Sequence, residues 1–428
     1  MKNLTYITVL FASVVLLSCR NQTQDPKVIK KEEPQLTARE ILGNPDYLAI
    51  SYGGYRLTSR DQQPTIAELK EDLLILHAMG IRILRTYNVH LPHASNVLKA
   101  IRELKTQDAS FEMYVMLGAW IDCKNAWTGL TVDHNQESER NEPEIQRAVA
   151  LAQTYPDIVK VIAVGNEAMV KWAEAYYVQA DVILKWVEYL QNLKKEGKLA
   201  KDLWITSSDN FASWGGGGPE YHTPDLEKLI KAVDYLSIHT YPMHDTHYNP
   251  AFWGVLPDET GLSKTEIIHK AMDRSLAYAV SQFDSVRHYM KSLGVEKPIH
   301  IGETGWASYS NELYGNSGSK ATDEYKQALY YQKMRKWSRE NQVSCFFFEA
   351  FDEPWKDAQN PQGSENHFGL FTVEGQAKFS IWEWVDKGVF TGLSRSGKPI
   401  SKTYKGDEES LLQEVLLPPV KDEILRSH

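Results

Sequence analysis

Short apolar runs alternate with amphipathic segments along most of the chain. Eight runs have the β-branched and aromatic character of strands, and they cover residues 48–52, 81–87, 112–117, 159–164, 204–207, 235–239, 299–301 and 343–348. The segments between them repeat apolar residues at helical spacing, as Leu69, Leu73 and Leu76 do before the helix-ending Gly80. Eight strands that alternate with helices over about 350 residues predict an α/β fold, a (β/α)₈ TIM barrel.

An open, doubly wound sheet is the structural alternative to the barrel. Such a sheet usually carries a glycine-rich phosphate loop after its first strand, and Gly53-Gly54 does not match that loop. We therefore expect one catalytic barrel domain over residues 41–395. Its loops after the sixth and eighth strands, residues 243–264 and 352–367, are expected to be extended and to shape specificity.

Beyond the barrel, residues 396–428 are expected to form a C-terminal extension. The segment 408–417 predicts one helix packed on the outside of the barrel.

The N-terminus has the pattern of an export signal. A basic head, Met1-Lys2-Asn3, precedes a mostly apolar stretch at 4–17 that is too short to span a bilayer comfortably. Leu16-Leu17-Ser18-Cys19 resembles a bacterial lipobox, which implies a lipoprotein signal peptide at 1–18, lipidation of Cys19 and a polar tether at 19–40. A plain signal peptide with an incidental cysteine is the alternative. The lipoprotein interpretation predicts a lipid-anchored protein of the bacterial cell envelope, on the periplasmic or surface side of the outer membrane.

Charge and composition narrow the range of partners. The formal net charge of −9 disfavours nucleic acid and favours a neutral ligand, because polyphosphates need basic patches. Cys123 and Cys345 are expected on the third and eighth strands, which are too far apart for a disulfide. His244 and His247 are expected to hydrogen-bond or contact sugar; metal binding is the alternative, and no metal or other cofactor is predicted.

Two glutamates follow predicted strands 136 positions apart. Glu167 ends the fourth strand and Glu303 the seventh. Because the C-terminal ends of barrel strands converge on one mouth, the two carboxyl groups can approach each other there to about 5 Å. A pair of this kind, one protonated and one ionised, carries out double-displacement sugar hydrolysis.

Three motifs resemble glycoside hydrolase family 17, the β-1,3-glucanase-type enzymes of a large retaining (β/α)₈ clan. They are Val-Gly-Asn-Glu at 164–167, Gly-Glu-Thr-Gly-Trp at 302–306 and Phe-Asp-Glu-Pro-Trp-Lys at 351–356, within a resemblance that covers about residues 45–390. The resemblance implies that Glu167 is the acid/base and Glu303 the nucleophile. The chain departs from many members by having Ala307-Ser308 where they have Pro-Ser.

The same resemblance suggests roles for further residues. Asn166 would bind the sugar 2-hydroxyl, or else cap the next helix; Tyr241 would orient the nucleophile, or else belong to the core. Arg85 and Tyr87 occupy second-strand positions near the substrate, with the satisfaction of buried carbonyls or a carboxylate as the alternative for Arg85.

The remaining candidates have weaker sequence signals. Glu353 and Lys356 match an extra acid and base beside the site, or form a structural ion pair. Trp306 and Trp120 are expected to stack on sugar rings, with core packing as the alternative for both. Candidates for lining the cleft are Glu349 and Asp209.

The leading hypothesis is a retaining β-1,3-glucan hydrolase for laminarin-type chains, a monomer that is endo-acting on family grounds alone. A β-1,3-glucosyltransferase with the same chemistry but a sugar acceptor is one alternative. A non-catalytic surface glycan-binding lipoprotein is another, disfavoured because both carboxylates are present.

Overall fold

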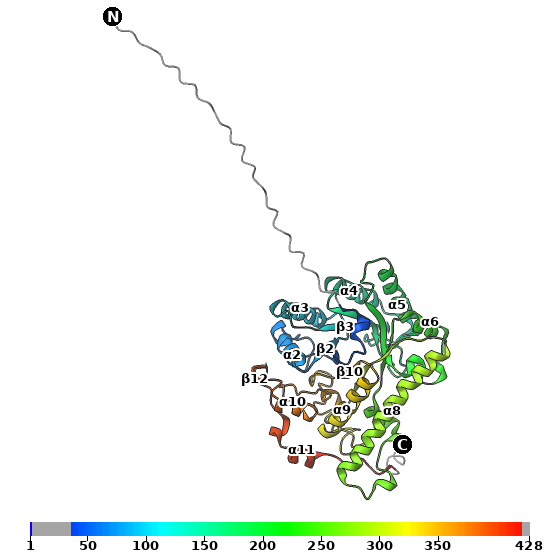
Figure 1. Ribbon diagram of the computed structural model, residues 1–428. Coiled ribbons are helices and arrows are strands. Elements are labelled where there is room, and N and C mark those ends of the chain that lie inside the picture. The colour runs from blue at the N-terminus through cyan, green and yellow to red at the C-terminus, as the bar shows by residue number, and fades with distance from the viewer. Residues whose placement is uncertain (2–35, 422–428) are drawn as a thin grey trace. The chain divides into compact units, whose positions relative to one another are not determined.

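Eight parallel strands form a closed barrel in this computed structural model, which describes Met1 and residues 36–421 (Figure 1). Their order around the barrel is β1-β10-β9-β8-β7-β6-β3-β2, and the predicted (β/α)₈ fold is confirmed. The strands are β1 (Leu48–Ser51), β2 (Ile81–Arg85), β3 (Tyr114–Ala119), β6 (Val159–Asn166), β7 (Trp204–Asn210), β8 (Leu236–His239), β9 (Ile299–Gly305) and β10 (Cys345–Phe348).

Helices surround the barrel (Figure 1). The connecting helices are α2 (Ile66–Ala78), α3 (Pro92–Gln107), α4 (Asn141–Thr154), α5 (Ala180–Lys195), α6 (Pro224–Ala232), α7 (Pro242–Tyr248), α8 (Lys264–Ser292) and α9 (Glu324–Glu340). Local sequence fixes several of their ends. Thr65 and Ser263 each begin a helix with a capping box, in which the hydroxyl and a glutamate three residues later satisfy free N–H groups.

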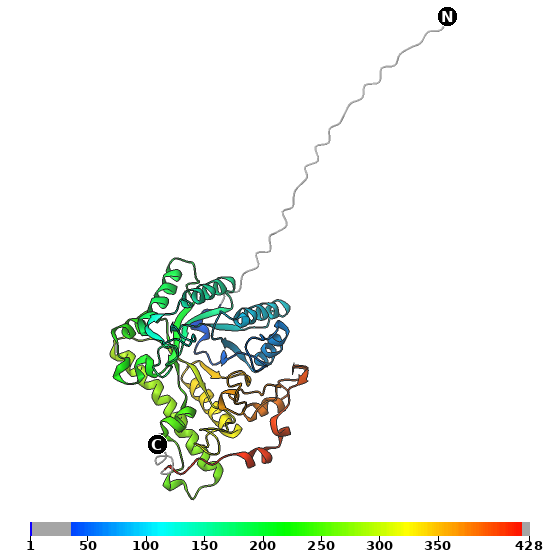
Figure 2. The same cartoon turned by 180° about the vertical axis from the view of Figure 1, so that it is seen from behind.

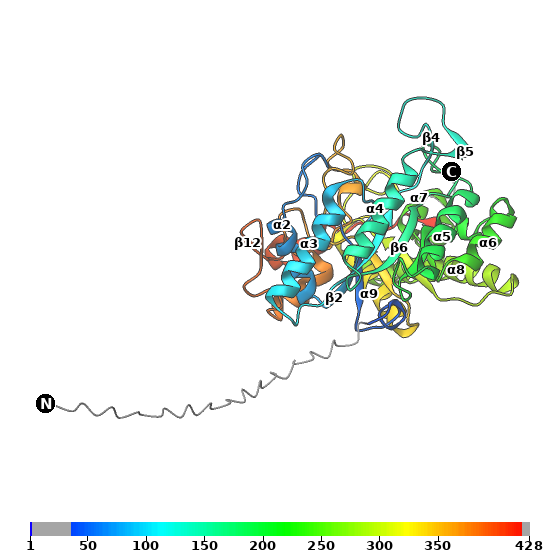
Figure 3. The same cartoon turned by 90° about the horizontal axis from the view of Figure 1, so that it is seen from above.

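One excursion interrupts the βα alternation after β3. A short antiparallel hairpin, β4 (Cys123–Lys124) with β5 (Asp133–Glu137), lies at the edge of the barrel (Figure 3). Cys123 is therefore in this hairpin and not on the third barrel strand as expected, whereas Cys345 does begin β10. Both thiols are buried and free.

The barrel interior changes from apolar to polar along its axis. At the end where the strands begin, Ile41, Ala49, Ile83, Met116 and Phe346 belong to one apolar cluster. Short helix α1 (Ala38–Ile41) supplies Ile41, so the folded body starts before residue 41. Towards the strand C-termini the inward-facing residues are polar, and that end carries the candidate site.

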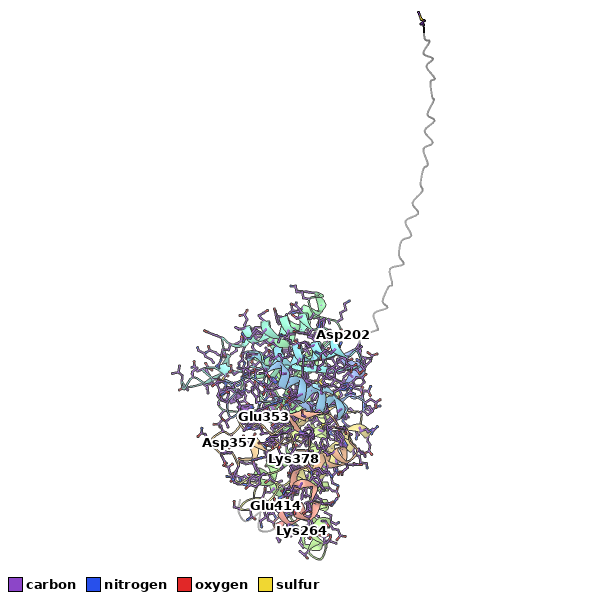
Figure 4. The ribbon with its side chains drawn as sticks, turned by 90° about the vertical axis from the view of Figure 1, so that its left-hand side faces the viewer. Asp202, Lys264, Glu353, Asp357, Lys378 and Glu414 are labelled. Carbon is purple, nitrogen blue, oxygen red and sulfur yellow. The ribbon has the colours of Figure 1, made fainter. Side chains whose placement is uncertain are left out.

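The C-terminal residues wrap across the outside of the barrel (Figure 2). The helix α11 (Glu408–Glu414) confirms the predicted terminal helix, and Lys264 Nζ donates to the carbonyl of Leu412, 3.2 Å away. Figure 4 shows Lys264 and Glu414 at the same end of the molecule. The chain then pairs with Val255, whose N–H donates to Pro419 (2.8 Å) and whose carbonyl accepts from Lys421 (3.1 Å). We call residues 415–421 the C-terminal strap.

The export signal, Cys19 and residues 19–35 of the tether lie outside the described residues. Within residues 36–421, no helix has the length and apolar character needed to cross a bilayer.

Candidate active site

A large cleft lies at the mouth formed by the C-terminal ends of the barrel strands. Its volume is about 1410 Å³, above the usual range for one drug-sized ligand, which suits an oligosaccharide. Eight residues proposed from sequence line it: Tyr87, Trp120, Asn166, Glu167, Tyr241, Glu303, Glu353 and Lys356.

The two glutamates meet in this cleft, next to one buried histidine. Nδ1 of His239 lies 3.1 Å from Glu167 Oε1 and 3.8 Å from Glu303 Oε2. Those two oxygen atoms are therefore at most about 7 Å apart, the sum of the two distances. Glu167 follows directly after β6 with φ +47°, a left-handed backbone conformation that is uncommon for a residue with a side chain. Such conformations recur at functional sites.

Glu303 is held as a carboxylate by a cation and a phenol. Arg85 Nη1 donates to Oε1 at 2.5 Å, and the Tyr241 hydroxyl donates to Oε2 at 2.7 Å. Burial alone would raise the pKa of Glu303, but His239, Arg85 and the bond from Tyr241 outweigh burial and lower it to about 2. The Glu303 side chain is thus an ionised, oriented group at neutral pH, as a nucleophile must be.

Arg85 and Asn166 form the base of the site. The Arg85 guanidinium, 1% exposed, also donates to the Gly302 carbonyl (2.8 Å) and to Asn166 Oδ1 (2.5 Å). Arg85 therefore satisfies a buried carbonyl and a carboxylate, which was the alternative expected for it, and that carboxylate is Glu303. Because Oδ1 of Asn166 is engaged with Arg85, its amide N–H₂ is the group left to meet a ligand in the cleft.

The loop after β10 places an ion pair at the cleft. Glu353 accepts from the Tyr55 N–H (3.0 Å) and the Trp355 indole (3.1 Å), and lies 3.5 Å from Lys356 Nζ. Glu353 and Lys356 thus form an ion pair. Because both residues also line the cleft, a ligand can still reach them.

Three residues expected to contact the ligand are buried instead. Trp306 is fully buried, its indole donates to the Ala321 carbonyl, and it packs against Trp253 and Tyr330, so its expected role as a sugar-stacking platform is wrong. Asp209 is also buried, and accepts from the Met169 N–H and the Ser213 hydroxyl, 2.7 Å from each.

Glu349, the third of them, lies beneath the cleft, 1% exposed and 3.8 Å from Lys356 Nζ. Burial, together with the nearby Glu353 and Asp352, raises its pKa well above the usual range despite Lys356. Burial thus favours the protonated form of Glu349, which does not line the cleft as expected.

Aromatic residues that the motifs did not reveal line the cleft. Trp127 (59% exposed), Trp172 (61%) and Tyr248 (63%) come from loops after β3, β6 and β8. Trp127 stacks on Tyr176 at 5.3 Å, and Tyr176 in turn contacts Trp120 at 5.2 Å. Exposed aromatic rings beside a polar cleft suit sugar rings.

The histidines near β8 act as hydrogen-bonding and stacking groups. The His244 ring stacks on Tyr241 at 5.2 Å and lies 3.6 Å from Glu365. Among the residues that the structure describes, no three His, Cys, Asp or Glu side chains are grouped as a metal site would require.

Comparison with known proteins places the chain among β-1,3-glucan-active proteins. Residues 49–369 match the BtgE/BtgC glycoside hydrolase domain. A probable glucan endo-1,3-beta-glucosidase btgC of Aspergillus flavus is 24% identical over 381 residues, which are 84% of this chain and 47% of that protein. The chain thus spans about half the length of that relative. A glucan 1,3-beta-glucosidase of Arthroderma benhamiae is 24% identical over 329 residues, 73% of this chain and 84% of that protein.

Solved structures share the fold. An endo-laminarinase from Formosa Hel1_33_131 is 71% identical, with a TM-score of 0.90 over 90% of this chain and 98% of that one. A glycoside hydrolase family 17 β-1,3-glucanosyltransferase from Rhizomucor miehei is 19% identical, with a TM-score of 0.53 over 78% and 96% of the two chains. Since the family match spans most of the sequence, the chain belongs to the BtgE/BtgC glycoside hydrolase domain family.

Proposed function

We propose that this chain is an endo-acting β-1,3-glucanase of the family 17 type that cleaves laminarin-type polysaccharide with retention of configuration. The observation that carries the proposal is the meeting of Glu167 and Glu303 at one histidine nitrogen inside a cleft large enough for several sugar units. The upper limit of about 7 Å on their separation admits the 5–5.5 Å of retaining enzymes. The solved endo-laminarinase at 71% identity supports the substrate and the endo mode.

In the first step, Glu303 attacks the anomeric carbon. The new C–O bond forms as the glycosidic C–O bond breaks, and the leaving oxygen takes its electron pair and the proton of Glu167. Arg85 and Tyr241 keep Glu303 ionised and aimed for this attack. In the second step, Glu167 accepts a proton from water, the water oxygen bonds to the anomeric carbon, and Glu303 leaves with its electron pair.

The cleft walls supply positions for more than one sugar. Trp127 and Trp172 lie on loops after β3 and β6, and Tyr248 ends α7, the helix after β8. Aromatic contacts spread over several loops can hold a chain on both sides of the scissile bond, which favours cleavage inside a polysaccharide.

Replacing each carboxylate tests the assignment. We expect Glu167→Gln to lower kcat on laminarin about 10²- to 10⁴-fold, the usual contribution of a general acid. Glu303→Ala should lower kcat on laminarin by a larger factor. When this variant is given azide and an activated aryl glycoside, azide should take the place of the missing carboxylate and give the α-glycosyl azide. Glu139→Gln is the matched control, an exposed carboxylate at the edge of the same cleft.

Near-normal turnover by either catalytic variant would reject the acid/base role of Glu167 or the nucleophile role of Glu303. Product analysis at high oligosaccharide concentration separates hydrolysis from transfer, because elongated products appear only when a sugar replaces water as the acceptor.

For its location, we propose that the protein is a monomer anchored to the bacterial cell envelope by lipid on Cys19, after removal of residues 1–18. The lipobox-like sequence supports this. Mass spectrometry of the mature N-terminus tests it: an acylated Cys19 is expected in wild type, and a soluble, unacylated product in Cys19→Ser.

A further inference from the structure

His239 lies outside the three sequence motifs, and the sequence assigns it no role in the chemistry. It ends β8, is fully buried, and presents Nδ1 to both carboxyl groups of the site, 3.1 Å from Glu167 Oε1 and 3.8 Å from Glu303 Oε2. Its other ring nitrogen, Nε2, lies 2.9 Å from Ser208 Oγ, which in turn lies 2.8 Å from Ser237 Oγ.

The space for this serine pair is built into the strand that carries the nucleophile. A Cβ atom added to Gly302 would lie 2.2 Å from Ser237 Oγ and 2.4 Å from Ser208 Oγ. The glycine directly before Glu303 thus leaves room for two hydroxyls that contact the histidine. All three residues of the chain Ser237, Ser208 and His239 are 0% exposed, so bulk water does not compete for their hydrogen bonds.

The contacts determine which ring nitrogen carries the proton. A neutral imidazole has one donor and one acceptor nitrogen. If Nδ1 were the acceptor, its lone pair would face the ionised Glu303 at 3.8 Å, which is repulsive. The favourable arrangement has Ser208 donating to Nε2, so that Nδ1–H points at the two carboxyl groups.

We infer that His239 is a positioning residue that directs one N–H to the acid/base Glu167, with its tautomer fixed by Ser208 and Ser237, and that this donor serves whichever carboxyl group is charged. The inference rests on the proposed function. Negative charge sits on Glu303 before the glycosyl–enzyme ester forms and on Glu167 afterwards. The fixed N–H of His239 stabilises the ionised Glu167 that proton donation leaves behind.

Other charged and titratable groups face the same site. They are Arg85 from β2, Tyr176 from the loop after β6, Asp209 from β7, Tyr241 after β8 and Lys356 after β10. Within the described residues, His239 is the group that hydrogen-bonds the Glu167 carboxyl, whereas Glu303 has Arg85 and Tyr241 as well. Removing the His239 donor should therefore destabilise the ionised form of Glu167 more than that of Glu303.

The test compares His239→Ala, His239→Asn and Ser208→Ala with wild type. Losing a donor to a carboxylate disfavours the ionised form, so the alkaline limb of kcat/KM on laminarin should move to higher pH, by about one unit, in His239→Ala. We expect kcat/KM to fall about tenfold to a hundredfold. His239→Asn, which restores an N–H near Nδ1, should recover part of both effects, and Ser208→Ala should reproduce part of the shift by releasing the tautomer.

A second substrate separates this role from a merely structural one. Dinitrophenyl β-laminaribioside has a leaving group that needs no proton, so His239→Ala should lose much less on it than on laminarin. Ser207→Ala is the matched control, a neighbouring buried serine whose Oγ has no hydrogen-bond partner among the residues that the structure describes. It should leave the limb in place.

Equal losses on both substrates with an unmoved alkaline limb would overturn the inference while leaving the hydrolase proposal intact. The hydrolase proposal itself fails separately, if the wild-type protein releases no sugar from β-1,3-glucan.

Discussion

A single guanidinium links the two halves of the catalytic pair. Arg85 contacts Glu303 directly and reaches Asn166, the residue before Glu167, at 2.5 Å for each bond. Because Arg85 is buried and always charged, it compensates the buried negative charge of Glu303 at every pH at which the protein is folded. The ionisation of Glu303, the proposed nucleophile, is therefore a property of its neighbours.

Removing one of those neighbours should change the acidic side of the pH profile. In Tyr241→Phe, Glu303 loses a donor to its ionised form, so its pKa should rise from about 2 by about one unit. The acidic limb of kcat/KM should move to higher pH, because activity needs Glu303 ionised. Assays on laminarin over a pH range that extends below about 2 measure this, and Tyr248→Phe, on the same cleft wall, should leave that limb in place.

Strand-end motifs predicted the residues at the centre of the site well, and predicted those around it poorly. Asn166 ends β6, Glu167 and Tyr241 follow strands, and Glu303 lies near the C-terminal end of β9, so their directions depend mainly on the barrel geometry. Trp306 lies beyond Glu303 in the same motif, and whether its ring turns into the core depends on Trp253, a partner 53 positions earlier that no local pattern reveals.

At the scale of elements, the β4–β5 hairpin contributes to one wall of the cleft. It connects β3 to α4 and carries Trp127, which stacks on Tyr176 from the loop after β6. Two loops from neighbouring strands thus support each other and present one exposed aromatic surface. The hairpin was not predicted, because residues 121–138 have no sustained apolar alternation.

Trp127→Ala should selectively weaken the binding of long substrates. Loss of an aromatic contact is worth about 1 kcal/mol, roughly fivefold in KM. We expect that increase for laminarin, with kcat and the turnover of dinitrophenyl β-laminaribioside little changed, because the reacting sugar lies elsewhere in the cleft. Trp337→Ala, a partly buried tryptophan of α9 remote from the cleft, is the comparison: it should affect stability and leave KM alone.

Most strands and helices followed from hydrophobic periodicity, with their ends displaced by a few residues. β9 continues to Gly305, past the predicted 301, because polar residues that face a barrel mouth do not look like strand residues. Helix α3 was not among the predicted helices. Its first turn, from Pro92, holds the polar His93 and Ser95, and the fold buries His93 against Tyr52 and Tyr55.

At the scale of the whole molecule, the C-terminal residues are part of the barrel's support. The strap pairs with Val255, on the loop that continues from α7, whose Tyr248 lines the cleft. Leu411 in α11 and Val415 at the start of the strap are both nearly inaccessible to solvent and anchor this part of the chain. The C-terminal extension expected from sequence is thus tied to the cleft wall.

Ending the chain at residue 406 should destabilise the protein and loosen that wall. Exposure of Leu411 and Val415 alone predicts a loss of about 3 kcal/mol or more in the free energy of unfolding. Urea denaturation measures the loss, and kcat/KM on laminarin should fall more than on the short aryl substrate. A chain that ends at residue 421 keeps the contacts of the strap and should match the full-length protein; if the two truncations behave alike, the strap has no such role.

The pairing of Arg395 with Asp72 has a consequence for how the protein folds. Asp72 is buried in α2, near the beginning of the barrel, and Arg395 Nε donates to it at 2.8 Å from more than three hundred residues later. Asp72 also accepts from Arg56 at 3.0 Å, so Arg395 is its second cationic partner and the one supplied by the last part of the barrel sequence. The first βα unit therefore gains its full set of buried contacts only after Arg395 has been synthesised, which makes closure of the barrel a late step in folding.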